Sequence, residues 1–349
     1  MPSIDQTLAE YSELFMLLAA FTYTVAFLAF CWDLARSSRS LASLEERLAA
    51  QQQQQPAREM VAAGASAGGG TDALPAERGD RNVAAHTADD AMQYSGTRRN
   101  AARVGVALTV LAAAIHAAGV ITRGMAAHRV PWGNMYEFCT TGALVVSVVF
   151  LIALVKKDLR FLGTFVIGLV LIMMMAATIG FPTPVAHLVP ALQSYWLIIH
   201  VSVAVLASAL FTLTFAMSVL QLLQSRREAK IRAGGGNTMG FLRLVPSALS
   251  LENLSYRINA VGFVLWTFTV IAGAIWAEQA WGRYWGWDTK EVWSFVIWVV
   301  YAGYLHARAT RGWTGTRAAW LSIVGYLCVV FNFTIVNIFF SGLHSYAGV

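Results

Sequence analysis

CTTGALVVSVVFLIALVKKDLRFLGTFVIGLVLIMMMAATIG, residues 139–180, decides the fold class of this chain. The stretch contains an apolar run that ends at Val155, a short basic segment from Lys156 to Arg160, and a second apolar run that ends at Gly180. A helix needs roughly 20 apolar residues to cross a bilayer. Both runs come close to this length, so the stretch predicts two membrane-spanning helices joined by a basic turn.

The rest of the chain has the same character. Of its 349 residues, 57% are hydrophobic and 13% are charged, and the mean hydropathy is +0.56. A soluble domain carries about 25% charged residues, so the composition excludes an ordinary soluble domain. We predict an all-α polytopic membrane protein with about eight transmembrane helices. The predicted spans are 14–32, 104–122, 137–155, 161–180, 195–222, 256–276, 292–308 and 318–340.

The distribution of basic residues predicts the orientation. If the N-terminus is outside, most of the 25 Lys and Arg residues fall in cytoplasmic segments, and only Arg123, Arg129, Arg283 and Lys290 lie outside. Lys and Arg concentrate in cytoplasmic loops, so we expect a cell-membrane protein with both termini extracytoplasmic. The same rule explains the net charge of +6 without a nucleic acid partner. The first run has no basic region before it and no cleavage site, which predicts a retained helix within residues 1–35 rather than a signal peptide.

Residues 36–103 differ from the rest. SLEERLAAQQQQQ could extend the first helix for a few turns, but residues from about 56 to 100 are rich in Ala, Gly and charge and have little to bury. We predict a largely disordered cytoplasmic linker, in which His86 has no special role. The linker would join the first helix to a seven-helix domain at 104–349.

Tryptophan is concentrated in WAEQAWGRYWGWDTKEVWSFVIW, residues 276–298, which holds six of the twelve tryptophans. An interfacial aromatic belt is the simplest interpretation. A belt needs one or two aromatic residues per helix end, however, whereas WGRYWGWD places several in one loop. Gly282 and Gly286 permit tight turns, and indole faces can stack on a large aromatic molecule. The loop 276–293 therefore predicts a stacking platform.

The cysteines limit the chemistry that is available. Cys31, Cys139 and Cys328 are widely separated and form no CxxC motif. This pattern excludes a disulfide scaffold, a zinc finger and a thioredoxin-like redox motif. Any metal chemistry must rest on the seven histidines.

The tryptophan loop resembles the WWD signature of heme-handling membrane proteins, WGxxWxWDxKE. The matching residues are Trp281, Gly282, Trp285, Trp287, Asp288, Lys290 and Glu291. Thr289 stands where that family commonly has proline, a change that could loosen the turn but removes no ligand. Four further stretches resemble the CcsA (ResC) branch of system II cytochrome c biogenesis: VPWGNMYEF at 130–138, LVPALQSYWLIIHV at 188–201, YLHAR at 304–308 and the terminal SGLHSYAG. The likeness extends over residues 104–349.

The resemblance implies heme export or presentation, followed by covalent attachment of heme to apocytochrome c. Heme b would be a transported substrate, and the chain would be one component of a cytochrome c heme lyase complex. The implied partners are a ResB-like membrane protein, an apocytochrome c with a CxxCH motif, and a thiol-reducing thioredoxin-like protein.

The family's histidines at two of these motifs hold an external heme, and this role carries over to His200 and His344 as iron ligands. The residues implied around the porphyrin are Trp281, Trp285, Trp287 and Asp288. From residue chemistry alone, two milder interpretations stay open. His200 could bond a neighbouring helix, and His344 could be a solvated terminal residue.

The family's histidine at the YLHAR motif ligates a second heme inside the membrane, so the resemblance implies that His306 is an iron ligand there. From residue chemistry alone, His306 could also be an interfacial histidine beside Arg308. It lies roughly 21 Å below the outer start of its span, where an ionisable residue is costly and usually functional. His116 would lie roughly 9 Å higher if the membrane is about 30 Å thick. The second ligand is therefore expected from another chain, and the family assigns it to the ResB component.

Two alternatives stay open at this stage. A bis-His electron-transfer subunit of the cytochrome b kind normally carries paired histidines on one helix, and no predicted span holds two. A solute transporter would need broken helices with charge at the midplane. The outer polar residues are equally ambiguous: Asp288, Lys290, Glu291 and Arg283 could hold heme propionates or brace the loop, and Asn134, Tyr136 and Glu137 could pin two outer loops together.

Overall fold

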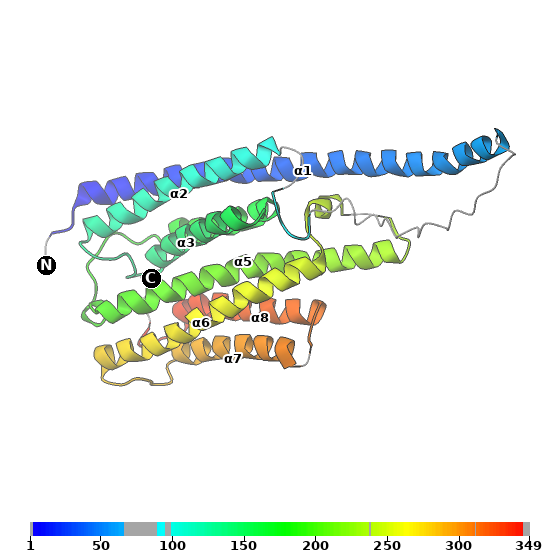
Figure 1. The fold of residues 1–349 in the computed structure, drawn as a ribbon. Coiled ribbons are helices and arrows are strands. Elements are labelled where there is room, and N and C mark those ends of the chain that lie inside the picture. Colours follow the sequence, from blue (N-terminus) through cyan, green and yellow to red (C-terminus); the bar gives the residue numbers. More distant parts are fainter. Residues whose placement is uncertain (1–2, 66–88, 95–98, 237–238, 311, 345–349) are drawn as a thin grey trace.

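The computed structural model describes residues 3–65, 89–94, 99–236, 239–310 and 312–344, and the regular elements in these ranges are all helical. The α-helices are α1 (Gln6–Ala65), α2 (Asn100–Ala126), α3 (Met135–Lys156), α4 (Gly163–Met175), α5 (Tyr195–Arg232), α6 (Ala248–Trp281), α7 (Thr289–Thr310), α8 (Thr316–Phe333) and α9 (Ile335–Phe339). Short 3-10 turns at Arg160–Leu162, Pro190–Leu192 and Gly240–Leu244, and a π turn at Ala176–Gly180, lie between or extend them. The long helices run side by side, and the start of α1 lies at the same end as the C-terminal segment (Figure 1).

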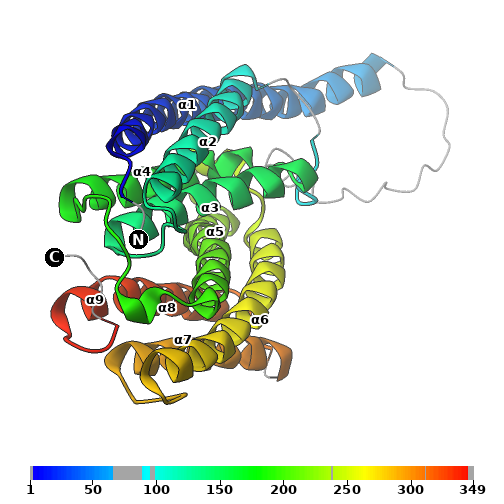
Figure 2. The same ribbon diagram turned by 90° about the vertical axis from the view of Figure 1, so that its left-hand side faces the viewer.

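The prediction of an all-helical polytopic membrane protein is confirmed. Seven helices in the described ranges are long and apolar enough to cross a membrane. The remaining predicted span, 292–308, lies within α7, which is helical but is not one of these seven. Its tryptophans and tyrosines, together with His306 and Arg308, reduce its hydropathy. It packs against α6 and α8 in the bundle (Figure 2).

The bundle has two halves, each with its own core. In the first half, α1 packs along α2, and a core of large apolar side chains lies between α1, α3, α4 and α5. In the second half, α5 packs along α6. There the Phe211 ring stacks on the Tyr301 ring, with centroids 3.8 Å apart. A Cβ on Gly262 of α6 would lie 2.6 Å from the Phe211 ring. The small residue thus permits the close helix approach that membrane packing needs.

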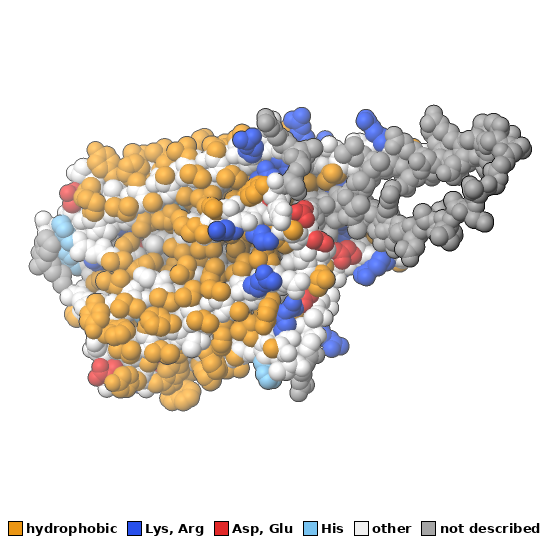
Figure 3. All heavy atoms as spheres, viewed as in Figure 1, with side chains coloured by type: hydrophobic (Ala, Val, Ile, Leu, Met, Phe, Trp, Pro, Cys, Tyr) orange, Lys and Arg blue, Asp and Glu red, His pale blue; other side chains and the backbone are white. Residues whose placement is uncertain are grey.

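The surface agrees with a membrane environment. Apolar side chains form a broad band across the bundle, and Lys and Arg side chains gather at the end from which α1 extends (Figure 3). The tryptophan loop between α6 and α7 lies at the other end (Figure 1).

The linker predicted at 36–103 is more ordered than expected in the parts that the structure describes. Helix α1 continues to Ala65, which is much longer than the few turns expected beyond the predicted span 14–32. The Ala, Glu, Arg, Leu and Gln residues of this extension favour helix. Residues 89–94 pack on the ends of the bundle: Met92 is 4% exposed, and the Tyr94 hydroxyl donates a hydrogen bond to the Leu154 carbonyl. The middle of the linker, including His86, lies outside the described residues.

Candidate functional site

A pocket opens at the end of the bundle that carries the tryptophan loop. Its empty space amounts to about 1050 Å³, part of it open to solvent. The walls come from the starts of α3, α5 and α7, the last turns of α6, the loop, and the segment around α8 and α9. The lining is mainly apolar and aromatic, with a few polar groups among the apolar ones. Such a pocket suits a large, mostly apolar ligand that is oriented by specific polar contacts.

His200 lines this pocket from the first turns of α5. Its Nδ1 lies 2.9 Å from the backbone carbonyl of Thr269 on α6. A carbonyl only accepts, so Nδ1 carries the proton and Nε2 is left with its lone pair. The ring lies parallel to Trp276, with centroids 5.9 Å apart and an interplanar angle of 11°. A Cβ on Gly273 would lie 2.7 Å from the imidazole, so α6 has room for this histidine only because a glycine stands there.

His344 lines the same pocket from the C-terminal segment. Its Nδ1 lies 2.5 Å from Oδ2 of Asp288, and its backbone N–H donates to the same oxygen at 3.2 Å. The hydrogen bond from His344 holds the pKa of Asp288 below its usual range. The contact is thus present at neutral pH and is lost only when acid protonates the carboxylate. The carboxylate orients the ring so that Nε2 is again the nitrogen available to a ligand.

Tryptophans hold the two histidines together. Trp276 contacts both rings, and its centroid lies 5.5 Å from that of His344. Trp281 packs edge-on against His344 at 4.8 Å. The two imidazoles are therefore neighbours in one pocket, although they are far apart in the sequence.

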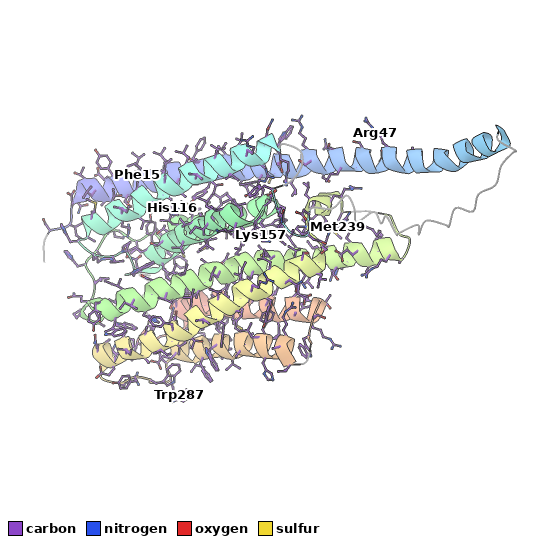
Figure 4. All side chains as sticks on the ribbon, viewed as in Figure 1. Phe15, Arg47, His116, Lys157, Met239 and Trp287 are labelled. Atoms are coloured by element: carbon purple, nitrogen blue, oxygen red, sulfur yellow. The ribbon has the colours of Figure 1, made fainter. Side chains whose placement is uncertain are left out.

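The loop places its other two tryptophans differently. Trp285 lines the pocket. Trp287, predicted to act with it, contacts Trp285 edge-on at 5.9 Å but is 74% exposed and does not line the pocket. Its φ of 59° lies in the left-handed region and is part of the turn that leads its side chain outward. Figure 4 shows Trp287 at the outer edge of the bundle.

Glu291 braces this loop. Its side chain is buried, and Oε2 accepts hydrogen bonds from the backbone N–H groups of Gly286 at 2.7 Å and Asp288 at 3.1 Å. Of the two roles left open for Glu291, bracing is the one these contacts support. Arg283 lies beside the carbonyl of Gly286 and does not line the pocket.

The pocket wall at the start of α3 depends on a buried ionic network around Glu137. This carboxylate is fully buried and accepts from Arg123 at 3.0 Å, from Arg129 at 2.7 Å and from the backbone N–H of Gly133 at 2.7 Å. The two arginines also donate to the carbonyls of Thr183 and Ala186 in the loop between α4 and α5. The network links the α2–α3 loop to the α4–α5 loop, which is the pinning role considered for Glu137. It thereby positions the pocket residues Trp132, Asn134 and Met135.

Comparison with known proteins identifies the chain. Residues 132–344, which include the loop and both pocket histidines, match the family model described as "Cytochrome C assembly protein". The "Cytochrome c biogenesis protein CcsA" of Guillardia theta is 36% identical over 264 residues, which cover 71% of this chain and 87% of the relative. This chain belongs to the CcsA family of cytochrome c biogenesis proteins. A CcsA of Synechococcus elongatus is 34% identical over 282 residues, 70% of this chain and 87% of the relative. A CcsA of Prochlorococcus marinus is 41% identical over 179 residues, 46% of this chain and 57% of the relative.

Membership of the CcsA family assigns this chain a role in cytochrome c biogenesis, which involves heme and apocytochrome c. Several pocket residues of this CcsA-family chain were not singled out as site residues in the sequence. Trp266, Thr269, Gly273 and Trp276 all line the pocket from α6. They recur at spacings of three and four residues, which places them on one helix face, and this periodicity is the signal that marks them.

The third predicted iron ligand lies elsewhere in this CcsA-family chain. His306 is exposed in the last turns of α7, about 25 Å along that helix from its start near the pocket. His116 of α2 is fully buried and packs edge-on against Tyr23 of α1, with ring centroids 5.9 Å apart. Figure 4 places His116 among α1, α2 and α3, whereas α7 lies on the other side of the bundle. The structure therefore does not bring His306 and His116 together.

Proposed function

We propose that this CcsA-family chain holds heme in the pocket through His200 and His344 and presents it to apocytochrome c for covalent attachment. The observation that carries the proposal is that both imidazoles are tethered through Nδ1 and line one aromatic pocket. Two neutral imidazoles are a common axial ligand set for heme iron. Heme would supply an iron that takes these nitrogens and vinyl groups that react with the cysteine thiols of a CxxCH motif.

The protein's own contribution is binding and orientation. The Trp276 and Trp285 rings offer apolar surface to a porphyrin, and the tethered imidazoles set its tilt. Asp288 and the Thr269 carbonyl fix the ring orientations from behind. Holding heme at a set position turns its meeting with the apocytochrome thiols into an effectively unimolecular encounter, which is a large share of what catalysis requires.

We assign the pocket to the extracytoplasmic side. Support comes from the basic side chains, which gather at the opposite end of the bundle (Figure 3), because Lys and Arg mark the cytoplasmic side. The charges of Arg123 and Arg129 at the pocket end are neutralised in part by Glu137. On this orientation, heme b would be a substrate that crosses the cell membrane before it is attached.

We further propose partners for the two ends of the route. His306 is exposed on α7, and an imidazole in this position suits a heme shared with a histidine of a ResB-like membrane protein. At the pocket, the partner would be an apocytochrome c, kept reduced by a thiol-reducing thioredoxin-like protein. The chain would thus act as one component of a cytochrome c heme lyase.

The proposal is tested by the heme content of the purified full chain. The unaltered chain should show the absorption spectrum of a low-spin, b-type heme with two histidine ligands. Trp285→Ala should lower heme retention several-fold, because a stacking face in the pocket is lost. Trp287→Ala should lower it much less, because that side chain points outward.

The matched pair controls for the loss of one indole from the same loop. Amounts of inserted protein should be equal in both variants. A chain that carries no heme under any condition would refute heme binding in the pocket. If both variants keep the heme content of the unaltered chain, the tryptophan loop is only an interfacial aromatic belt.

The shared inner heme makes a separate prediction. With the ResB-like partner co-expressed, His306→Ala should deplete one of two hemes, measured as heme per complex by pyridine hemochrome. His116→Ala should leave both hemes in place, because the His116 ring is enclosed by α1, α2 and α3. Two hemes in the chain without its partner, one of them lost on His116→Ala, would contradict the shared site.

A further inference from the structure

Among the residues that the structure describes, Lys290 is the one Lys or Arg that lines the pocket. It stands in the first turn of α7, two residues after Asp288, and it lines the pocket together with His200 and His344. Other basic groups at this end are engaged elsewhere. Arg123 and Arg129 are held by Glu137, and Arg283 lies outside the pocket.

No carboxylate in the described part of the chain forms an ion pair with Lys290. Its Nζ donates to Oδ1 of Asn337 at 2.5 Å and lies 4.9 Å from the centre of the Phe333 ring. The nearby carboxylates are engaged: Asp288 binds His344, and Glu291 binds backbone N–H groups of the loop. The charge of Asp288 acts on Lys290 without forming an ion pair with it, and an ammonium group among aromatic side chains gains from a directly bound opposite charge.

The rest of the pocket explains which ligand group would supply that charge. The ligand surface must be mostly apolar to match the aromatic lining. A single cation beside the histidine pair then suits a ligand that carries a carboxylate at its edge. An ammonium forms short, charge-assisted hydrogen bonds with a carboxylate, which are stronger than its present bond to a neutral amide.

We propose that Lys290 is the carboxylate-binding residue of this pocket and pairs with a propionate of heme. The inference rests on the proposed function, since it assumes that the pocket holds heme. Asn337 positions the ammonium group, and the propionate carboxylate then replaces the Asn337 amide as the main acceptor. Lys290 thereby sets the rotation of the porphyrin about the iron axis, and with it the direction in which the vinyl edge points.

The test compares two porphyrins on the full chain purified in detergent without bound heme. Iron protoporphyrin IX and its dimethyl ester are titrated separately, and binding is followed by the Soret absorption. The unaltered chain should bind the free acid more tightly, on the order of tenfold, which is the effect of one hydrogen bond between charged groups. Lys290→Met should lose this preference and keep its affinity for the ester. Lys290→Arg should retain most of the preference.

Lys156→Met is the matched control, because Lys156 is exposed at the far end of α3. This variant should keep the preference for the free acid. Equal binding of acid and ester by the unaltered chain, each with a bis-histidine spectrum, would overturn the role of Lys290 and leave heme binding intact. A full preference for the free acid in Lys290→Met would also overturn the role of Lys290 and leave heme binding intact. Absence of a bis-histidine spectrum with either porphyrin would instead refute the proposed function.

Discussion

Replacing His200 or His344 with alanine is expected to remove heme from the purified chain and to abolish cytochrome c assembly. Loss of a residue that only supports a metal ligand costs roughly 10–100-fold in affinity, so loss of the ligand itself should cost at least as much. The measurements are the heme spectrum of the purified variant and the amount of c-type cytochrome formed in cells. Added imidazole should partly restore both, because it can fill the vacated position on the iron.

Asp288→Asn provides a graded comparison. Its amide oxygen can still accept from His344, but the charge that orients the imidazole is lost. We expect about tenfold weaker heme retention, with no rescue by imidazole because the ligand is still present. His187→Ala, at an exposed position in the loop between α4 and α5, is the control for removing a histidine. Normal heme content and assembly in both His200→Ala and His344→Ala would show that neither residue is a ligand.

Replacing Glu137 with alanine is expected to have the largest effect on stability. The change leaves Arg123 and Arg129 without their carboxylate, although Arg123 is only 2% exposed. Removing one partner of a buried ion pair costs about 3–5 kcal/mol. The variant should therefore lower the thermal unfolding midpoint in detergent and reduce the amount of chain in the membrane. Heme retention should fall as well, because the network positions one wall of the pocket.

Two further variants make this result specific. Glu137→Gln should be intermediate, because the amide can keep an acceptor for one arginine but not the charge. Glu10→Ala, an exposed residue in the first turns of α1, should unfold like the unaltered chain. A Glu137→Ala chain that unfolds at the normal temperature would show that the network contributes no stability.

The membrane spans are predictable from the sequence because the property that defines them is local. Each apolar run needs only its own length and composition to form a membrane-spanning helix. Span 292–308 shows where this reasoning weakens, since its tryptophans and tyrosines, together with His306 and Arg308, reduce its hydropathy although it forms helix α7. Residues 89–94 show a second limit. Their polar sequence predicts disorder, yet Met92 is buried, because burial depends on which helix ends lie nearby.

The amino-acid sequence was enough to predict the fold class, the family resemblance and, among the residues that line the candidate site, His200, His344 and Trp285. These follow from residue types and short spacings along the chain. What each of these side chains does depends on the tertiary structure. It directs Trp287 outward and Lys290 into the pocket, and it joins His344 to Asp288 across 56 positions of sequence. These contacts form only when α5, α6, α7 and the C-terminal segment pack together, and no local pattern of residues encodes that packing.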